Sequence, residues 1–245
     1  MTDHSPTSDR GTALVTAAAR RVGRQLALTL AELGFDIAVH CHTSISDAEK
    51  TAQEIRELGR KAKVFQCDLR DVERTKSLLK TVAAEMSPLT MLINNASVFR
   101  QIGMLKSTDA DFDENFAVHV KAPYLLIREF GLHCRGHVVN IIDTNVVYNS
   151  TAYFPYMLSK KTLFELTKMS ARELAPDIRV NAIAPGIILP PDLVDREKFE
   201  RDSVKNPLHQ KASPSDVCRA LEYLVRSQHV TGECLFVDGG DHVAC

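Results

Sequence analysis

A tyrosine and a lysine four residues apart, Tyr156 and Lys160, are the side chains of this sequence best suited to proton chemistry. In a helix, this spacing places both side chains on one face. A lysine ammonium held near a phenol favours the phenolate, so it lowers the tyrosine pKa from its unperturbed value of about 10. A tyrosine tuned in this way can act as a general acid near neutral pH. Such pairs also arise by chance on many helices, so the surrounding elements must support this hypothesis.

Asp143 lies just upstream of the pair, at the end of an apolar run that predicts a buried strand. Similar short apolar runs alternate with longer amphipathic segments along the whole chain. This alternation predicts an α/β fold: a single doubly wound Rossmann-type domain of about seven parallel strands, joined by right-handed crossovers and flanked by helices. Ligands of such sheets bind at the carboxyl ends of the strands. The expected strands are Thr12–Thr16, Asp36–His40, Ala62–Gln66, Leu89–Ile93, His137–Ile142, Arg179–Ile183 and Cys234–Val237. The expected helices are Gly23–Leu33, Ser46–Leu58, Asp71–Met86, Asp109–His133, Ala152–Ala175 and Pro214–Arg226.

The turn after the first strand reads A-A-A-R-R-V-G from Ala17 onward. A dinucleotide-binding turn needs small residues, because backbone amides must approach the pyrophosphate at the helix N-terminus. Two of the three expected glycines are replaced, by Ala17 and Arg21, and Gly23 remains. Alanine is nearly as slim as glycine, and an arginine can lie along a phosphate. We therefore expect Arg20, Arg21 and Val22 to bind the cofactor, with an ordinary tight turn as the alternative.

The second strand ends in H-C-H-T-S, without the acidic residue that usually binds the ribose hydroxyls of NAD. Arg20, His42 and Ser44 are placed to receive a 2′-phosphate instead, so the sequence favours NADPH. His40 and His42 share a strand face, but no third ligand is apparent, so we predict no metal site. The group His133, Cys134 and His137 is interpreted as a solvated helix end for the same reason.

Composition narrows the function further. The chain has 245 residues, 44% of them hydrophobic, and a net charge of -1, which indicates no surface for nucleic acid or anionic membranes. Residues 1–10 are polar and are predicted to be a disordered tail that precedes one catalytic domain, residues 11–245; they lack the apolar core of a signal peptide. Six cysteines without a C-x-x-C pair indicate reduced thiols, and hence a cytoplasmic protein.

Further motifs fall in an order that resembles the short-chain dehydrogenase/reductase family. They are C-D-L at 67–69, N-N-A-S at 94–97, the Tyr156/Lys160 pair, N-A-I-A-P-G at 181–186 and V-D-G-G at 237–240. The resemblance extends from about Thr12 to Gly240 and implies an oxidoreductase with Tyr156 and Lys160 as catalytic residues. It also implies that the cofactor is bound by Asp68, at the adenine edge, and by Asn95, Ala96, Ser97, Lys160, Pro185 and Gly186.

Two positions depart from that family pattern. The usual active-site serine is replaced by Asp143, and an asparagine that holds a water in a proton relay is replaced by His119. With the A-A-A-R-R-V-G turn and the S-V-F run at 97–99, Asp143 makes the chain similar to the pteridine reductases. His119, followed by P-Y-L-L, resembles their bacterial dihydromonapterin/dihydrofolate reductase branch. This likeness implies that Arg21 and Ser97 contact cofactor and pterin, that Phe99 stacks on the pterin ring, and that Asp143 assists Tyr156.

The sequence thus predicts an NADPH-dependent reductase of a dihydropterin. A flat pterin suits a stack against Phe99, and a carboxylate at Asp143 can accept a hydrogen bond from a ring N–H. Two alternatives stay open: a reductase of 3-oxoacyl or steroid-like carbonyls, and a catalytically silent NADP(H)-sensing protein. The family resemblance also implies a homotetramer. Two long helices support it with surplus apolar positions, for example Tyr124, Leu125, Leu163 and Leu166.

Overall fold

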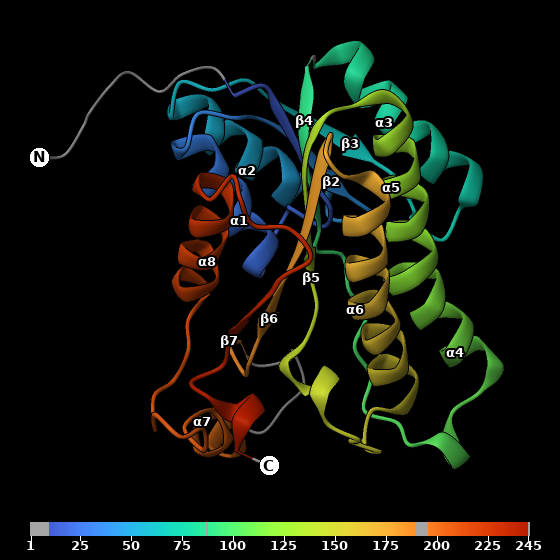
Figure 1. The fold of residues 1–245 in the computed structure, drawn as a ribbon, viewed down its shortest axis with the longest axis vertical. Helices are drawn as coiled ribbons and strands as arrows, with labels where there is room; N and C mark the ends of the chain where they lie inside the picture. Colours follow the sequence, from blue (N-terminus) through green and yellow to red (C-terminus); the bar gives the residue numbers. More distant parts are fainter. Residues whose placement is uncertain (1–9, 87, 190–195, 245) are drawn as a thin grey trace, which may run out of the picture.

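A seven-stranded parallel sheet between two layers of helices forms the molecule (Figure 1). The computed structural model describes residues 10–86, 88–189 and 196–244, so the expected disordered tail lies, except for Arg10, outside the described residues. The strands follow the order β3-β2-β1-β4-β5-β6-β7, which confirms the predicted doubly wound fold. Their bounds are β1 Thr12–Val15, β2 Asp36–Cys41, β3 Ala62–Gln66, β4 Leu89–Asn94, β5 Gly136–Ile141, β6 Ile178–Pro185 and β7 Cys234–Val237.

The two helical layers cover opposite faces of the sheet (Figure 1). Helices α1 (Arg21–Glu32), α2 (Ile45–Glu57) and α8 (Pro214–Arg226) lie on one face. Helices α3 (Val72–Glu85), α5 (Ala122–His133) and α6 (Phe154–Leu174) lie on the other. None of the helices in the described ranges combines the length and the apolarity that a bilayer span requires.

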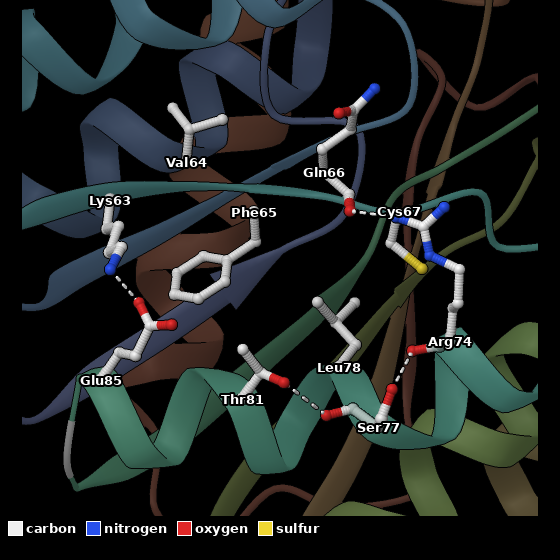
Figure 2. A pocket seen from close by; sticks show the side chains of 10 residues that line it. All are labelled: Lys63, Val64, Phe65, Gln66, Cys67, Arg74, Ser77, Leu78, Thr81 and Glu85. Atoms are coloured by element: carbon white, nitrogen blue, oxygen red, sulfur yellow. Dashed lines mark hydrogen bonds and ion pairs between the residues drawn. The ribbon is translucent and has the colours of Figure 1, made fainter.

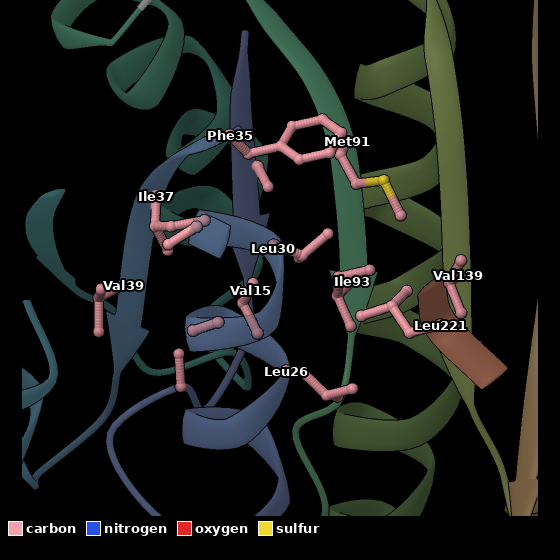
Figure 3. Close-up of a cluster of buried hydrophobic side chains, with 14 of the residues drawn as sticks. Val15, Leu26, Leu30, Phe35, Ile37, Val39, Met91, Ile93, Val139 and Leu221 are labelled. Atoms are coloured by element: carbon pink, nitrogen blue, oxygen red, sulfur yellow. The ribbon is translucent and has the colours of Figure 1, made fainter. Parts of the chain in front are cut away.

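Alternate residues of the central strands supply the two cores. Val15 packs toward the α1 face, where Leu26 and Leu30 of α1 meet Leu221 of α8 (Figure 3). Leu14, the neighbour of Val15, packs into the opposite core with residues of α3 and α5. Because both faces of the sheet are buried, the strands read as continuous apolar runs rather than as alternating ones. The sheet order reverses between β1 and β4, and this switch point is where doubly wound folds bind ligands.

The expected single helix from Asp109 to His133 is wrong in one respect. Helix α4 (Asp109–Phe116) passes into a π-helical turn, Ala117–Lys121, before α5 begins. Pro123 gives the physical reason, because proline has no N–H to donate to the carbonyl of His119 four residues earlier. The N–H of Ala122 instead reaches back to the carbonyl of Ala117. Turns of this type are frequent at functional sites.

Candidate active site

The turn between β1 and α1 keeps a glycine-type backbone without the glycines. Ala17 and Arg21 have φ values of 51° and 54°, in the left-handed region that side chains with a Cβ avoid. Each such residue costs roughly 1 kcal/mol or more, so the surroundings must enforce the conformation. We call residues 17–23 the cofactor turn. The two residues that replace glycines therefore adopt a conformation that glycine reaches readily.

Two side chains, His40 and Asn95, hold the cofactor turn in place. The amide of Ala17 donates to Nδ1 of His40 at 3.0 Å, and Nε2 of the same ring donates to the carbonyl of Cys67 at 3.0 Å. Asn95 donates through Nδ2 to the carbonyls of Thr16 and Ala17, at 2.9 and 3.4 Å. Burial lowers the pKa of His40 to about 4, so the ring stays neutral and can both accept and donate. Sequence reasoning had considered His40 only as a metal ligand.

Gly23 is required by the packing of the turn itself. A Cβ at this position would lie 2.2 Å from the carbonyl oxygen of Ala17 and 2.5 Å from Nδ2 of Asn95. The N-cap residue Arg20 makes no side-chain capping hydrogen bond, and the first turn of α1 carries no acidic residue. A helix N-terminus of this kind attracts an anion. Arg20, Arg21 and Val22, which the sequence predicts as cofactor-binding residues, lie at this helix N-terminus.

Beyond β2, the residues expected to bind a 2′-phosphate lie near acidic partners. Nε2 of half-exposed His42 is 3.5 Å from a carboxylate oxygen of Asp68. Arg70 donates to Asp68 at 2.8 Å, and chiefly this hydrogen bond lowers the pKa of Asp68 to about 2. Arg20 lies 3.7 Å from Asp47. Ser44 precedes α2 at its N-cap position and makes no side-chain capping bond.

Asp143 and Tyr156 meet at the carboxyl end of β5. The Tyr156 hydroxyl donates to Oδ2 of Asp143 at 2.8 Å, while Oδ1 accepts from the backbone amide of Asn145 at 2.8 Å. Asp143 thereby caps a short 3₁₀ turn, Thr144–Val147, which fixes the carboxylate. Tyr156 lies in the first turn of α6 and is buried.

The expectation that Lys160 lowers the pKa of Tyr156 is wrong. Burial, followed by the charge of Asp143 and the hydrogen bond to it, raises the pKa of Tyr156 well above 10. Lys160 points its Nζ to the carbonyl of Ile141, at 2.9 Å, and this atom lies 5.8 Å from the centre of the Tyr156 ring. Burial lowers the pKa of Lys160 itself to about 8. The phenol therefore stays protonated, with a carboxylate as its nearest charged partner.

Aromatic rings surround Tyr156. The ring centre of Phe99, on the loop after β4, lies 4.9 Å from that of Tyr156, edge to face. It also lies 4.9 Å from Tyr153, nearly parallel. Phe99 is about half exposed, so part of its ring is open to a ligand. Sequence reasoning missed Tyr153, although its position three residues before Tyr156 places it close to the same face of α6.

The remaining predicted residues of the site are Ser97, Ala96, Pro185 and Gly186. Ser97 lies 3.0 Å from Nε2 of His119 and forms a hydrogen bond to Tyr156 that opposes the rise of its pKa. Ala96 donates its amide to Thr16 at 3.0 Å. Pro185 ends β6, and Gly186 lies so close to the backbone of Asp238 that a Cβ there would be 3.0 Å away. We call Ser97, Asp143 and Tyr156 the catalytic wall.

Two surface hollows lie apart from the predicted catalytic residues. A surface hollow of about 290 Å³ lies between β3 and α3 at the edge of the sheet, lined by residues such as Lys63, Phe65 and Arg74 (Figure 2). It contains none of the predicted site residues. A second hollow, of about 270 Å³, adjoins Gly186 and Asp238.

Within the described ranges, no group of three histidine, cysteine, aspartate or glutamate residues is arranged to hold a metal ion.

Comparison with known proteins agrees with this geometry. Residues 11–201 match the family model described as short chain dehydrogenase, so the chain belongs to the short-chain dehydrogenase family. The 3-oxoacyl-[acyl-carrier-protein] reductase FabG of Staphylococcus aureus is 30% identical, over 93% of this chain and 96% of the relative.

Two solved structures are more similar in sequence. FolM alternative dihydrofolate reductase 1 from Brucella suis, in complex with NADP, is 37% identical with a TM-score of 0.92, over 96% of each chain. The Brucella canis protein of that description, also with NADP, is 36% identical with a TM-score of 0.93, over 98% of this chain and 97% of the other. Both structures contain the cofactor that the sequence predicts for this chain.

Proposed function

We propose that this protein is an NADPH-dependent reductase of dihydropterins, which converts a 7,8-dihydropterin to the tetrahydro form. The observation that carries the proposal is the hydrogen bond from Tyr156 to the carboxylate of Asp143. Serine usually occupies this position in the family, and a hydroxyl suits a ketone because it can donate to the developing alkoxide. A carboxylate beside such an oxygen would be repelled, whereas it can accept a hydrogen bond from a ring N–H.

The pKa shifts suit the reductive direction. Reduction of the C6=N5 bond needs a hydride at C6 and a proton at N5, and bound NADPH supplies the hydride. Tyr156 remains protonated because burial and Asp143 raise its pKa, so the phenol holds a proton for N5, whose basicity rises as the hydride reaches C6. Asp143 orients that phenol and stabilises the bound ring. Phe99 offers the exposed part of its ring as a stacking surface.

The Brucella structures support the proposal by their description as dihydrofolate reductases with NADP. Their identity to this chain, 37% and 36%, exceeds the 30% of the Staphylococcus relative. The cofactor turn and the absence of an acidic residue directly after β2 support NADPH as the cofactor. We expect NADPH to bind at least about tenfold more tightly than NADH, a difference of about 1.4 kcal/mol.

A second candidate is a 3-oxoacyl reductase, because the FabG relatives match nearly the whole chain. One assay with NADPH separates the two functions when it offers dihydrobiopterin, dihydromonapterin, dihydrofolate and a 3-oxoacyl thioester in turn. We expect turnover of at least one dihydropterin and little of the thioester. The reverse result would establish the carbonyl reductase. Binding of NADPH without its oxidation in a single turnover, whichever substrate of this panel is present, would point to a sensing protein.

We also propose that the protein assembles as a homotetramer. Of the apolar residues named for an interface, Leu125 and Leu163 are buried within the chain, but Tyr124 is half exposed. Leu132 on α5 and Met169 on α6 are exposed as well and extend this apolar surface. Light scattering at micromolar concentration would contradict the proposal if it gave the mass of one chain.

A further inference from the structure

His119 is a buried histidine that the proposed reaction does not use. It lies in the π-helical turn between α4 and α5, with only 1% of its surface exposed. Its ring meets the ring of Tyr156 edge to face, with centres 5.4 Å apart. Two segments contact it: the loop after β4, through Ser97 and Val98, and the first turns of α6, through Ser159.

The hydrogen bonds of this ring define its tautomer. The backbone amide of Val98 can only donate, and it points at Nε2 from 3.1 Å, so Nε2 must accept. The ring proton is therefore on Nδ1, which donates to the Ser159 hydroxyl at 2.8 Å. Ser159 in turn donates to the backbone carbonyl of Tyr156 at 2.7 Å. Burial, together with the nearby charge of Lys160, lowers the pKa of His119 well below its ordinary value and keeps the ring neutral.

The Ser97 hydroxyl lies between this ring and the reacting phenol. It is 3.0 Å from Nε2 of His119 and within hydrogen-bonding reach of the Tyr156 oxygen, and its single proton is donated to one of these two acceptors at a time. Both ring nitrogens of His119 thus have protein partners. A ring bonded on both sides can fix the loop after β4 relative to α6. It is less suited to holding a relay water beside Lys160.

We propose that His119 is a positioning residue whose Nε2 fixes the Ser97 hydroxyl and the Val98 amide beside Tyr156. The loop that carries Ser97 and Val98 also carries Phe99. The same hydrogen bonds to His119 therefore fix the position of the Phe99 ring relative to the Tyr156 hydroxyl. Displacement of about 1 Å in such an arrangement can cost on the order of a hundredfold in rate. The inference rests on the proposed function only in taking Tyr156 as the proton donor.

Two substitutions at His119 distinguish the role of Nε2 from that of Nδ1. The amide of His119→Gln can reach the position of Nε2 and accept from Val98, whereas that of His119→Asn reaches only the position of Nδ1. We expect His119→Gln to keep kcat/KM within about threefold of the wild type and His119→Asn to lose at least about tenfold, mainly in kcat. Urea unfolding of both variants supplies the stability control. Equal losses that follow stability, or an unimpaired His119→Asn, would overturn the proposal.

A spectroscopic measurement tests the tautomer without any substrate. In protein labelled with ¹⁵N-histidine, the signals that disappear in His119→Gln belong to His119, one of nine histidines. At neutral pH we expect ring nitrogen shifts of the Nδ1–H tautomer. An Nε2–H tautomer or a charged ring would contradict the proposal. If the wild type reduced no dihydropterin, the proposed function would fail, yet this spectrum would still decide the role of His119.

Discussion

The cofactor turn and the catalytic wall both depart from the short-chain dehydrogenase pattern, but the departures have opposite consequences. In the turn, Ala17 and Arg21 replace glycines and still adopt left-handed backbone conformations. In the wall, Asp143 replaces a serine and becomes the partner of the Tyr156 hydroxyl. In the proposed function the turn binds the pyrophosphate chiefly through backbone groups, so replacement of a glycine side chain should preserve that contact. In the proposed function the wall acts through side chains, so we expect a single change there to alter which substrate it suits.

The largest expected effect tests the wall. Asp143→Ala should lower kcat/KM for a dihydropterin by about two orders of magnitude, the size of a general acid–base contribution. The physical reason is that Tyr156 loses the carboxylate that orients its hydroxyl. Steady-state kinetics at saturating NADPH would measure the loss.

Asp143→Ser is the matched control for this prediction. It restores the hydroxyl usual in the family, so we expect it to recover little pterin turnover and to gain some ketone reduction. Tyr156→Phe should be severe with either class of substrate. A wild type that reduces 3-oxoacyl thioesters and tolerates Asp143→Ala would instead make the carboxylate a bystander and remove the contrast between turn and wall.

Gly23→Ala tests the limit of tolerance in the turn. Unlike Ala17, this position has no room for a Cβ, which would lie 2.2 Å from a backbone oxygen. We expect NADPH affinity to fall at least about tenfold, roughly 1.4 kcal/mol, because the turn must open to relieve the clash. Fluorescence titration of NADPH would measure it. Gly103→Ala, where the nearest contact of a Cβ is an ordinary 3.5 Å, is the control and should bind NADPH like the wild type.

The sequence predicted the order of strands and helices well, because each strand is a local apolar run and each crossover has a fixed hand. It predicted less well whatever depends on contacts between distant segments. The pKa of Tyr156 was expected to fall, since spacing along a helix cannot reveal that Asp143 faces the phenol while Lys160 bonds Ile141. His40 was missed as a support of the turn because its partners, Ala17 and Cys67, belong to other elements.

A smaller effect concerns His40 and acid. This buried ring has a pKa of about 4 instead of 6.5, so the unfolded chain binds more protons than the folded one between these values. Stability is therefore complete above pH 6.5 and falls as the pH drops toward 4. From pH 7 to pH 5, His40 should remove about 2 kcal/mol of unfolding free energy. Urea unfolding at both pH values would measure the difference.

His40→Gln supplies the comparison for this acid effect. Glutamine does not titrate, so the variant should be less stable at pH 7 but should lose less stability between pH 7 and pH 5. His137, whose pKa burial lowers to about 3, contributes a similar slope in both proteins. An unchanged slope in the variant would show that His40 does not carry this proton.

The smallest expected effect concerns backbone strain in the cofactor turn. Ala17→Gly replaces a strained residue, with φ 51°, by one that adopts this conformation freely. Relief of roughly 1 kcal/mol of strain or more is partly offset by about 0.4–1 kcal/mol of extra chain entropy in the unfolded state. We expect a net stabilisation of at most about 1 kcal/mol, which raises Tm by about 2–4 °C in a domain of this size.

Gly59→Ala is the reverse substitution at another left-handed position and is the comparison for Ala17→Gly. Gly59 has φ 81° and open space around its Cα, so an added Cβ meets no atom and the substitution changes only backbone strain. It should lower Tm by a few degrees, with about 1 kcal/mol lost. If Ala17→Gly also lowered Tm, the side chain of Ala17 would stabilise the turn by its own packing. The turn would then depend on side chains as the catalytic wall does, and the contrast between the two regions would narrow to the single position of Gly23.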